Sequence, residues 1–353
     1  MAAMSEQGVT PATTRVLRSA GRTTGALLGS LVIFGLIILV LGANPFSALR
    51  SIYDGSLGNR FNFGQTVMIT SLLALTGLAA AIPFSARLFN VGGEGQLYVG
   101  AIVAAGSSLT LPSTTPHVLF VAIVVALSML GGALWAAVPG VLKATVNANE
   151  VITSLMMTFI AILLANYAIT VVWPQGAVPQ TENVPTGATL GNIWDGTLVT
   201  SGVIFAVVAV LIAWVIMARM TLGFTIRAAG LNRNAAHMGG VNIGLVTVVS
   251  FALGGAFAGL AGAISVLGIN GALVSGFSGS FGYLGVAVAL VARLKPAWII
   301  PSAFLFAALR VGSNGLQVDT GLSPSVGEAL VATLVLLLLG FKVIRLSYAE
   351  AAE

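Results

Sequence analysis

Phe84-Ser-Ala-Arg-Leu-Phe-Asn-Val-Gly-Gly-Glu-Gly-Gln-Leu-Tyr-Val-Gly-Ala101 is a polar, glycine-containing run between two apolar segments. Only 7% of the chain is charged, so the cluster of Arg87, Asn90, Glu94 and Gln96 is unusual. Polar groups and broken backbone are costly in a membrane unless they are buried in protein or line a cavity. The stretch therefore predicts either a re-entrant segment or an inner loop at residues 84–96.

The composition defines the class of protein. The 353 residues are 57% hydrophobic, and their mean hydropathy of +1.02 excludes a soluble globular fold. The absence of cysteine excludes disulfides and thiolate metal sites. The two histidines, His117 and His237, are too far apart in sequence for a convincing metal site. The fold class predicted is an all-α polytopic membrane protein.

Apolar runs predict about ten transmembrane segments. They lie at 25–43, 64–83, 96–111, 118–140, 151–173, 198–218, 242–268, 281–293, 297–311 and 325–341. With the N-terminus inside, all basic residues except Arg50, Arg60 and Arg310 fall on the cytoplasmic side. Both termini are then cytoplasmic, and the positive charge indicates orientation, with no nucleic-acid partner. The expected parts are a tail at 1–24, one transmembrane domain at 25–345, and a tail at 346–353.

Several predicted segments are short, and they fall in both halves of the chain. Segments 281–293 and 297–311 are too short for a full span, and 96–111 is also short. Tyr98–Ala104 aligns with Tyr283–Ala289, in the third and eighth segments. An offset of five spans makes the copies inverted. This predicts inverted repeats with short or broken helices near the centre, where transporters place a central pathway.

Segment 242–268 carries small residues at a spacing that brings helices close together. Gly254, Gly255, Gly259 and Gly262 have alanines between them. This spacing predicts tight helix packing and says nothing about substrate.

Two loops are distinctive. The inner loop at 219–241 is purely basic, and no acidic residue occurs from Gly196 to Val318. It has an alanine-rich middle that can form a short helix, capped by Thr225. A loop that only orients the chain explains the arginines but not this length. The outer loop at 174–197 carries tryptophans and prolines that predict an ordered structure, either an interface lid or a contact for an external protein.

Three stretches carry a resemblance to a known family: Leu88-Phe-Asn-Val-Gly-Gly-Glu-Gly-Gln-Leu97, Asn149-Glu-Val-Ile-Thr-Ser-Leu-Met-Met157 and Arg227-Ala-Ala-Gly-Leu-Asn-Arg-Asn-Ala-Ala-His-Met-Gly239. The chain resembles the permease subunits of bacterial ABC importers for nucleosides and simple sugars, those served by receptors of the basic membrane protein type. In such permeases the third stretch matches the coupling helix that docks on the ATPase. Arg227 stands where the wider ABC pattern E-A-A-x-x-x-G has Glu.

The resemblance implies a set of partners. The chain has no G-x-x-x-x-G-K-[ST] loop, so ATP-Mg would be bound by a separate ATPase subunit. The chain itself would be a permease with no catalytic residue and no cofactor. Its expected partners are ABC ATPase subunits, a second related permease, an external substrate-binding lipoprotein and the bilayer of a bacterial inner membrane. The expected ATPase-coupling residues are Arg227, Ala228, Ala229, Gly230, Asn232, Arg233 and His237.

The candidate pathway residues form two groups. Glu94 is predicted as a gate or as an ion pair with Arg87, the alternative being an exposed cytoplasmic turn. Asn90 and Gln96 can bond sugar hydroxyls or satisfy a broken helix backbone. Polar amides and aromatic rings near the outer ends suit a nucleoside, which offers hydroxyls and a stacking base. These outer residues are Asn62, Gln65, Asn270, Phe277 and Tyr283.

Asn149 and Glu150, which open segment 151–173, are read either as a helix cap or as a functional contact.

Two alternatives stay open. An ion-coupled secondary transporter usually needs carboxylates in the membrane, and only Glu94 and Glu328 are candidates. A purely structural membrane subunit would not need polar, glycine-broken segments.

Overall fold

The computed structural model describes most of the chain in two compact units. The described residues are 29, 31–112, 114–321, 323, 325–327, 329, 330, 332, 333 and 336. The larger unit is Ser56–Val311, and the smaller is Met1–Gly55 with Gly312–Glu353. The expected tails at 1–24 and 346–353, and Glu328, lie outside the described residues.

The elements are almost all helical. They are α2 (Pro45–Leu57), α3 (Arg60–Ser85), α4 (Gly93–Thr110), α5 (His117–Val146), α6 (Glu150–Tyr167), the π-helix η1 (Ala168–Val172), β1 (Pro174–Gln175), β2 (Val178–Thr181), the 3-10 helix η2 (Thr186–Ala188), α7 (Gly202–Arg219), α8 (Thr221–Leu231), α9 (Arg233–Met238), α10 (Ile243–Ile264), the π-helix η3 (Ser265–Asn270), α11 (Phe281–Val291), the 3-10 helix η4 (Pro296–Trp298) and α12 (Ile299–Thr320). A further helix, Leu31–Val40, meets α2 at a bend of 114°.

The multi-pass helical membrane fold is confirmed, whereas the count of ten spans is not. Among the described residues, six helices are long and apolar enough to cross a membrane, or seven if the bent pair is one span. They are Arg60–Ser85, His117–Val146, Glu150–Val172, Gly202–Arg219, Ile243–Asn270 and Pro296–Gln317. α4 is less apolar because it begins with Glu94 and Gln96, and α11 has only 11 residues. Most of the predicted segment 325–341 lies outside the described residues.

Two details of the helix prediction are wrong. The segment 297–311 was expected to be too short for a span, but α12 continues from Ile299 to Thr320, 22 residues. The apolar run stops earlier than the helix because Arg310, Ser313 and Asn314 follow. Sequence reasoning also missed α2, which carries Arg50 and Asp54 as an exposed pair at 3.4 Å and is too polar to be recognised as a span.

α3 lies at the centre of the larger unit. Its apolar window is 89% buried, as expected for a helix that is hydrophobic on all sides. Leu72, Leu73, Leu75 and Leu78 are fully buried. The helix begins at the cap Asn59, whose side chain accepts a hydrogen bond from the Asn62 backbone N–H at 2.8 Å.

The glycines of α10 confirm the predicted tight packing, and they do so against three different helices. A Cβ at Gly254 would clash with Ala79 of α3, and one at Gly255 or Gly259 with the backbone of α5. At Gly262 the obstacle is the backbone of α4 around Leu97 and Ala101. α10 therefore joins α3, α4 and α5 by close backbone contacts.

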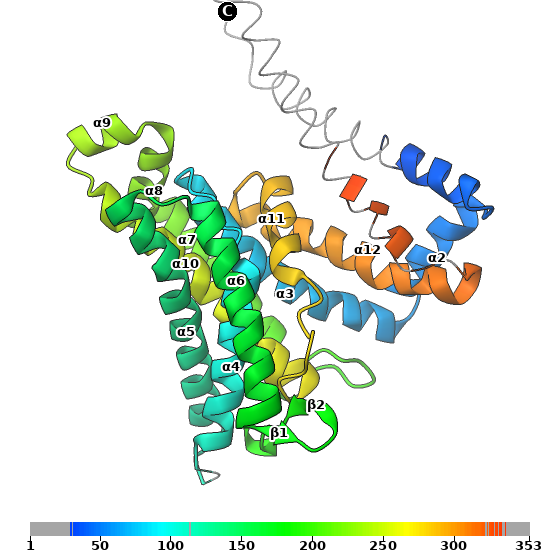
Figure 1. Cartoon of the computed structure of the whole chain (residues 1–353). Helices are drawn as coiled ribbons and strands as arrows, with labels where there is room; N and C mark the ends of the chain where they lie inside the picture. Colours follow the sequence, from blue (N-terminus) through cyan, green and yellow to red (C-terminus); the bar gives the residue numbers. More distant parts are fainter. Residues whose placement is uncertain are drawn as a thin grey trace, which may run out of the picture. The chain divides into compact units, whose positions relative to one another are not determined.

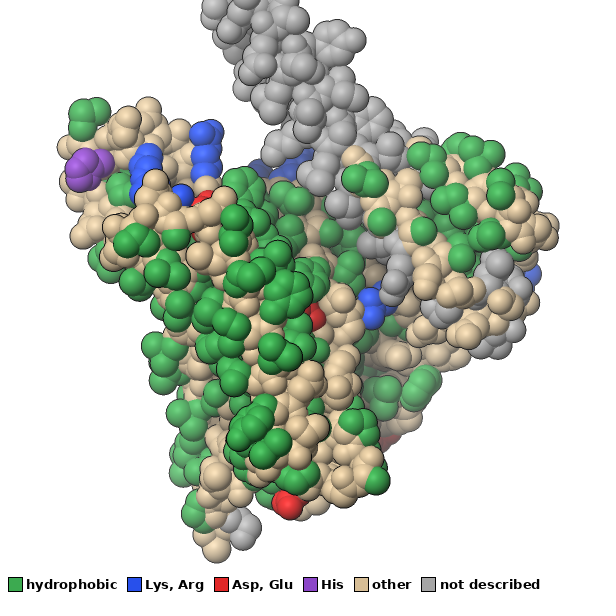
Figure 2. Space-filling view, viewed as in Figure 1, with side chains coloured by type: hydrophobic (Ala, Val, Ile, Leu, Met, Phe, Trp, Pro, Cys, Tyr) green, Lys and Arg blue, Asp and Glu red, His purple; other side chains and the backbone are tan. Residues whose placement is uncertain are grey.

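The two ends of the larger unit differ. Figure 1 shows α8 and α9 at one end and the hairpin of β1 and β2 at the other. In Figure 2, hydrophobic side chains cover much of the visible side between these ends, while Lys and Arg gather near α8 and α9. Such an apolar belt between polar ends is what a lipid-embedded protein presents.

The loop at 174–197, which the sequence predicts to lie outside, is ordered, as expected. β1 and β2 are antiparallel, with Pro174 opposite Thr181. The loop is bonded to the chain that follows α10: Thr181 N–H donates to Leu273 O at 2.9 Å, and Val184 N–H to Gly271 O at 2.8 Å. At the same end, the Arg60 guanidinium lies over the Trp194 ring, 5.1 Å from its centroid.

Candidate functional site

Glu94 joins the starts of two helices. It lies in the first turn of α4 with only 3% of its surface exposed. Its Oε2 accepts a hydrogen bond from the Gly282 backbone N–H of α11 at 2.6 Å, and its Oε1 accepts one from Ser278 Oγ. The Tyr98 hydroxyl lies 3.4 Å from Ser278 Oγ. A carboxylate at the N-terminus of α11 also matches the positive end of the helix dipole.

The backbones of α4 and α11 come close enough for this contact because Gly93 and Gly282 face each other. A Cβ at Gly282 would overlap the backbone of Glu94, so only glycine allows α11 to begin this close to α4. The preceding loop turns through positive φ at Gly271, Gly276 and Gly279, and Ser280 has φ +68°. The start of α11 is also bound to α3, because Thr76 Oγ1 donates a hydrogen bond to Phe281 O at 3.0 Å.

Asn90 and Gln96 are bonded to each other. Asn90 Nδ2 donates to Gln96 Oε1 at 3.1 Å, and Gln96 Nε2 donates to Asn90 Oδ1 at 3.0 Å. Asn90 also bonds Ala79 O of α3 at 3.1 Å and accepts from Gly92 N–H at 3.0 Å. Each side chain is 1% exposed. The Asn90 amide therefore bonds backbone groups at the helix break before α4. Contact of either amide with a sugar hydroxyl stays a prediction.

Two interpretations of Glu94 are wrong. Burial excludes an exposed cytoplasmic turn. The expected ion pair with Arg87 is not formed between these two described residues, because the oxygens of Glu94 accept hydrogen bonds from Ser278 and Gly282. The physical reason is that Arg87 lies in the left-handed turn that ends α3 and is exposed. The chain then runs into the core before it reaches Glu94.

The outer candidates do not form one cluster. Phe277 stacks edge-to-face on Tyr98, with centroids 4.9 Å apart, and so belongs to the Glu94 group, as does half-buried Tyr283 beside Gly282. Asn62 and Gln65 are half-buried at the start of α3, where Gly64 approaches Thr197 of the outer loop. Asn270 is exposed and its Nδ2 donates to Ser265 O at 3.2 Å.

The predicted inner loop forms two helices. Thr225 does not cap a helix, because it lies inside α8 and donates to Leu222 O at 2.9 Å. Asn232 caps α9 instead, accepting from Ala235 N–H at 3.0 Å. Arg227, Arg233 and His237 are exposed, whereas Ala228 and Ala229 are half-buried and Gly230 is buried. A Cβ at Gly230 would clash with Ser85 O, so α8 rests directly on the end of α3.

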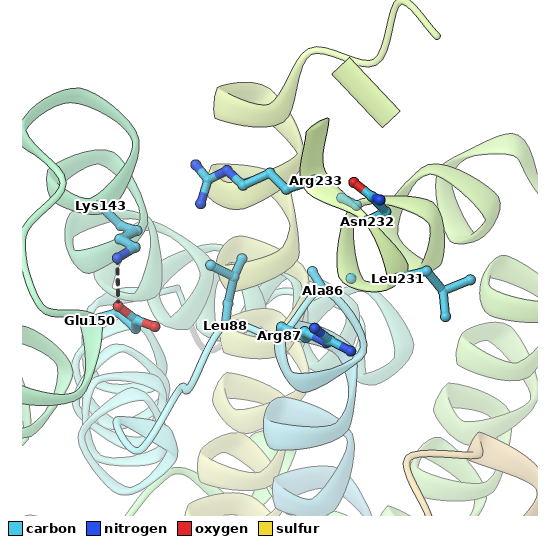
Figure 3. A pocket seen from close by; sticks show the side chains of 10 residues that line it. Ala86, Arg87, Leu88, Lys143, Glu150, Leu231, Asn232 and Arg233 are labelled. Atoms are coloured by element: carbon cyan, nitrogen blue, oxygen red, sulfur yellow. Dashed lines mark ion pairs between the residues drawn. The ribbon is translucent and has the colours of Figure 1, made fainter. Parts of the chain in front are cut away.

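A pocket of about 440 Å³ opens beside this contact. Figure 3 shows Lys143 and Glu150 on one side and Leu231, Asn232 and Arg233 on the other. Asn149 caps α6 by accepting from Val151 N–H at 3.0 Å, and Glu150 pairs with Lys143 at 3.1 Å. The remaining lining residues are Ala86, Arg87, Leu88, Ala229 and Gly230.

Comparison with known proteins identifies the class. Residues 62–339 match the family described as branched-chain amino acid transport system / permease component. Because the match covers most of the chain, the chain belongs to this family of permease components, and it is a multi-pass membrane protein.

The curated relatives narrow the class. The chain is 33% identical over 319 residues to a guanosine ABC transporter permease protein of Bacillus subtilis, covering 88% of this chain and 90% of the relative. It is 30% identical to a nucleoside ABC transporter permease protein of Lactococcus lactis, covering 88% and 86%. It is also 30% identical to a glucose ABC transporter permease protein of Haloferax volcanii, covering 89% and 85%.

Proposed function

We propose that this chain is the permease subunit of an ABC importer and forms the translocation pathway for nucleosides by alternating access. A separate ATPase supplies the energy. Two of the relatives above are named for nucleoside or guanosine transport and one for glucose, so simple sugars are the second cargo class. The aromatic and polar group beside Glu94, made of buried Tyr98 and Ser278 and half-buried Phe277, suits a base and a ribose.

The contact of Gly230 with Ser85 carries this proposal. It joins the inner helix α8 to α3 without an intervening side chain. Two residues of α3 make hydrogen bonds to these regions. Ala79 O accepts one from Asn90, and Thr76 Oγ1 donates one to Phe281 O at the start of α11. Displacement of α8 therefore reaches both helices that Glu94 joins. Packed helices with direct backbone contacts move as rigid bodies, as alternating access requires.

The distribution of charge supports one orientation in the membrane. In the proposed arrangement α8 and α9 face the cytoplasm with both termini, and the hairpin end faces outward. Arg227 and Arg233 then contact the ATPase subunits, while the ordered outer loop contacts a substrate-binding lipoprotein. A second, related permease completes the pathway. The excess of basic residues at the α8–α9 end supports this orientation.

Ion coupling is the weaker alternative. A coupling carboxylate needs to exchange its partners for Na⁺ or H⁺ during each cycle. Both oxygens of Glu94 instead accept hydrogen bonds from α11 and its preceding loop, which suits a structural joint. Glu328, the other candidate, lies outside the described residues.

The test is purification of the chain from its native membrane, followed by uptake measurements in proteoliposomes. We expect a P-loop ATPase to co-purify, and [³H]guanosine uptake to require ATP and to be competed by nucleosides more strongly than by glucose. The Arg227→Glu, Arg233→Glu double variant should insert normally and lose most uptake. Transport driven by an ion gradient without ATP would contradict the proposal, and unchanged uptake in the double variant would remove the coupling assignment.

A further inference from the structure

The pocket beside α8 carries unbalanced positive charge. Arg87, Lys143 and Arg233 line it, with Glu150 as the single acid among its lining residues. Lys143 and Glu150 neutralise each other at 3.1 Å. Within the described part of the chain, neither Arg87 nor Arg233 forms an ion pair. Two exposed guanidinium groups therefore line one cavity of about 440 Å³ without a carboxylate partner.

Arg87 occupies a position that normally favours glycine. The Arg87 N–H donates to Phe84 O at 3.0 Å, and the Leu88 N–H donates to Pro83 O at 3.0 Å. These two bonds form a Schellman turn that ends α3, with Arg87 at its left-handed residue, φ +56°. A non-glycine side chain there costs on the order of 1 kcal/mol. A cation at the end of α3 is favourable for the helix dipole, but the turn itself does not need a guanidinium that lines a pocket.

We infer that an acidic side chain of the ATPase subunit enters this pocket and is held between Arg87 and Arg233. This rests on the proposed function, because it assigns the α8–α9 end to the ATPase. Carboxylates are the natural partners of guanidinium groups, which offer several donors in fixed directions. The ATPase then contacts the end of α3 through Arg87 as well as α9 through Arg233. Because Arg87 is three residues from Asn90, this contact acts directly on the break before α4.

The experiment measures binding of the co-purifying ATPase to this permease assembled with its native partner permease in nanodiscs of fixed lipid composition. The first variant is Arg87→Gly, which keeps the left-handed turn and removes the guanidinium. The second is Arg233→Glu. The control is Arg219→Glu, at the end of α7, whose guanidinium stacks on Trp214 with the ring centroid 6.0 Å away and does not line the pocket.

We expect ATPase affinity to fall about tenfold for Arg87→Gly and further for Arg233→Glu, since each removes one partner of a desolvated charge pair. Arg219→Glu should change it less than about threefold, as rim charges do. A photoreactive residue at position 87 should crosslink to the ATPase near an Asp or Glu. Replacing that acid by Arg should restore binding to an Arg87→Glu permease.

The outcomes separate this inference from the proposed function. If the unaltered permease binds no ATPase, the proposed function fails and the inference fails with it. If the unaltered permease binds the ATPase and Arg87→Gly binds it equally well, only the inference is overturned. Loss of an anionic lipid from the Arg87→Gly assembly in native mass spectrometry, with ATPase affinity unchanged, would assign the pocket to a lipid headgroup and also overturn it.

Discussion

Glu94 and Glu150 are both acids in the first turn of a helix, yet their surroundings differ. Glu94 is 3% exposed, and its hydrogen bonds come from a distant part of the same unit. Glu150 pairs locally with Lys143 at the mouth of a pocket that has two further guanidinium groups. The polar side chains around Glu94 form hydrogen bonds within the chain. The pocket, in contrast, is lined by positive charge that an acidic group of another protein can bind. The first region therefore holds the permease together, and the second is suited to receive a partner.

Substitution of Gly230 should give the largest effect, because this residue connects the two regions. In Gly230→Ala the new Cβ would overlap Ser85 O, so α8 must move away from α3. Overpacking of this kind costs about 1–3 kcal/mol. We expect ATP-dependent uptake to fall more than about tenfold, with ATPase binding reduced much less.

The matched control for this change is Gly239→Ala, at the residue that follows α9. Its new Cβ would have Ala235 O and Ala236 O as nearest neighbours, both at 3.4 Å, so nothing has to move. Uptake by Gly239→Ala should stay within about twofold, since surface changes usually have small effects. Equal uptake by the two variants would show that α8 does not act through α3.

Glu94→Gln should have the next largest effect. Glutamine keeps the size of the side chain, but it has a single acceptor oxygen. One of the two hydrogen bonds accepted from Ser278 and Gly282 is therefore lost, and the other loses the strengthening that a charge provides. The positive end of α11 also loses its negative partner. Together these predict a loss of about 1–2 kcal/mol at the joint and a five- to tenfold reduction in uptake. Membrane levels should change less than uptake.

The comparison for Glu94→Gln is Asp54→Asn, which neutralises an exposed acid of α2. Both variants are measured by uptake at equal amounts of protein in the membrane. If Glu94→Gln transports as well as Asp54→Asn, the carboxylate is not needed to join α4 to α11.

The sequence predicts those parts of the structure that depend on local pattern. Apolar runs located the helices because lipid requires them to be long and apolar, and Asn149 marked the start of α6 because Asn caps helices. Gly254 and its neighbours predicted close packing because only small residues allow it. The alignment of Tyr98 with Tyr283 was the one signal that connected the two halves.

The remaining features depend on contacts that no local pattern reveals. Ser278 is 184 residues from Glu94, so their bond appears only when α11 has packed against α3 and α4. The spacing of Arg87 and Glu94 suggested a pair across a glycine break, about two helical turns apart, whereas Arg87 itself lies in a left-handed turn and is exposed. α12 extends past the end of its apolar run, so hydropathy alone could not find its last residues.

Glu150→Gln should have the smallest effect on uptake, and it should raise ATPase binding. The substitution removes the mostly buried pair with Lys143, and loss of the acid at the start of α6 costs about 0.3–1 kcal/mol. Asn149 still caps the helix, so uptake should remain within about twofold.

Lys143, freed from its partner, adds a third cation to the pocket. ATPase affinity should therefore rise about two- to threefold at low salt, and the gain should shrink at high salt because salt screens the longer-range attraction between the two proteins. A fall in affinity at every salt concentration would mean that Glu150 itself contacts the ATPase, and the contrast between the two glutamates would then no longer hold.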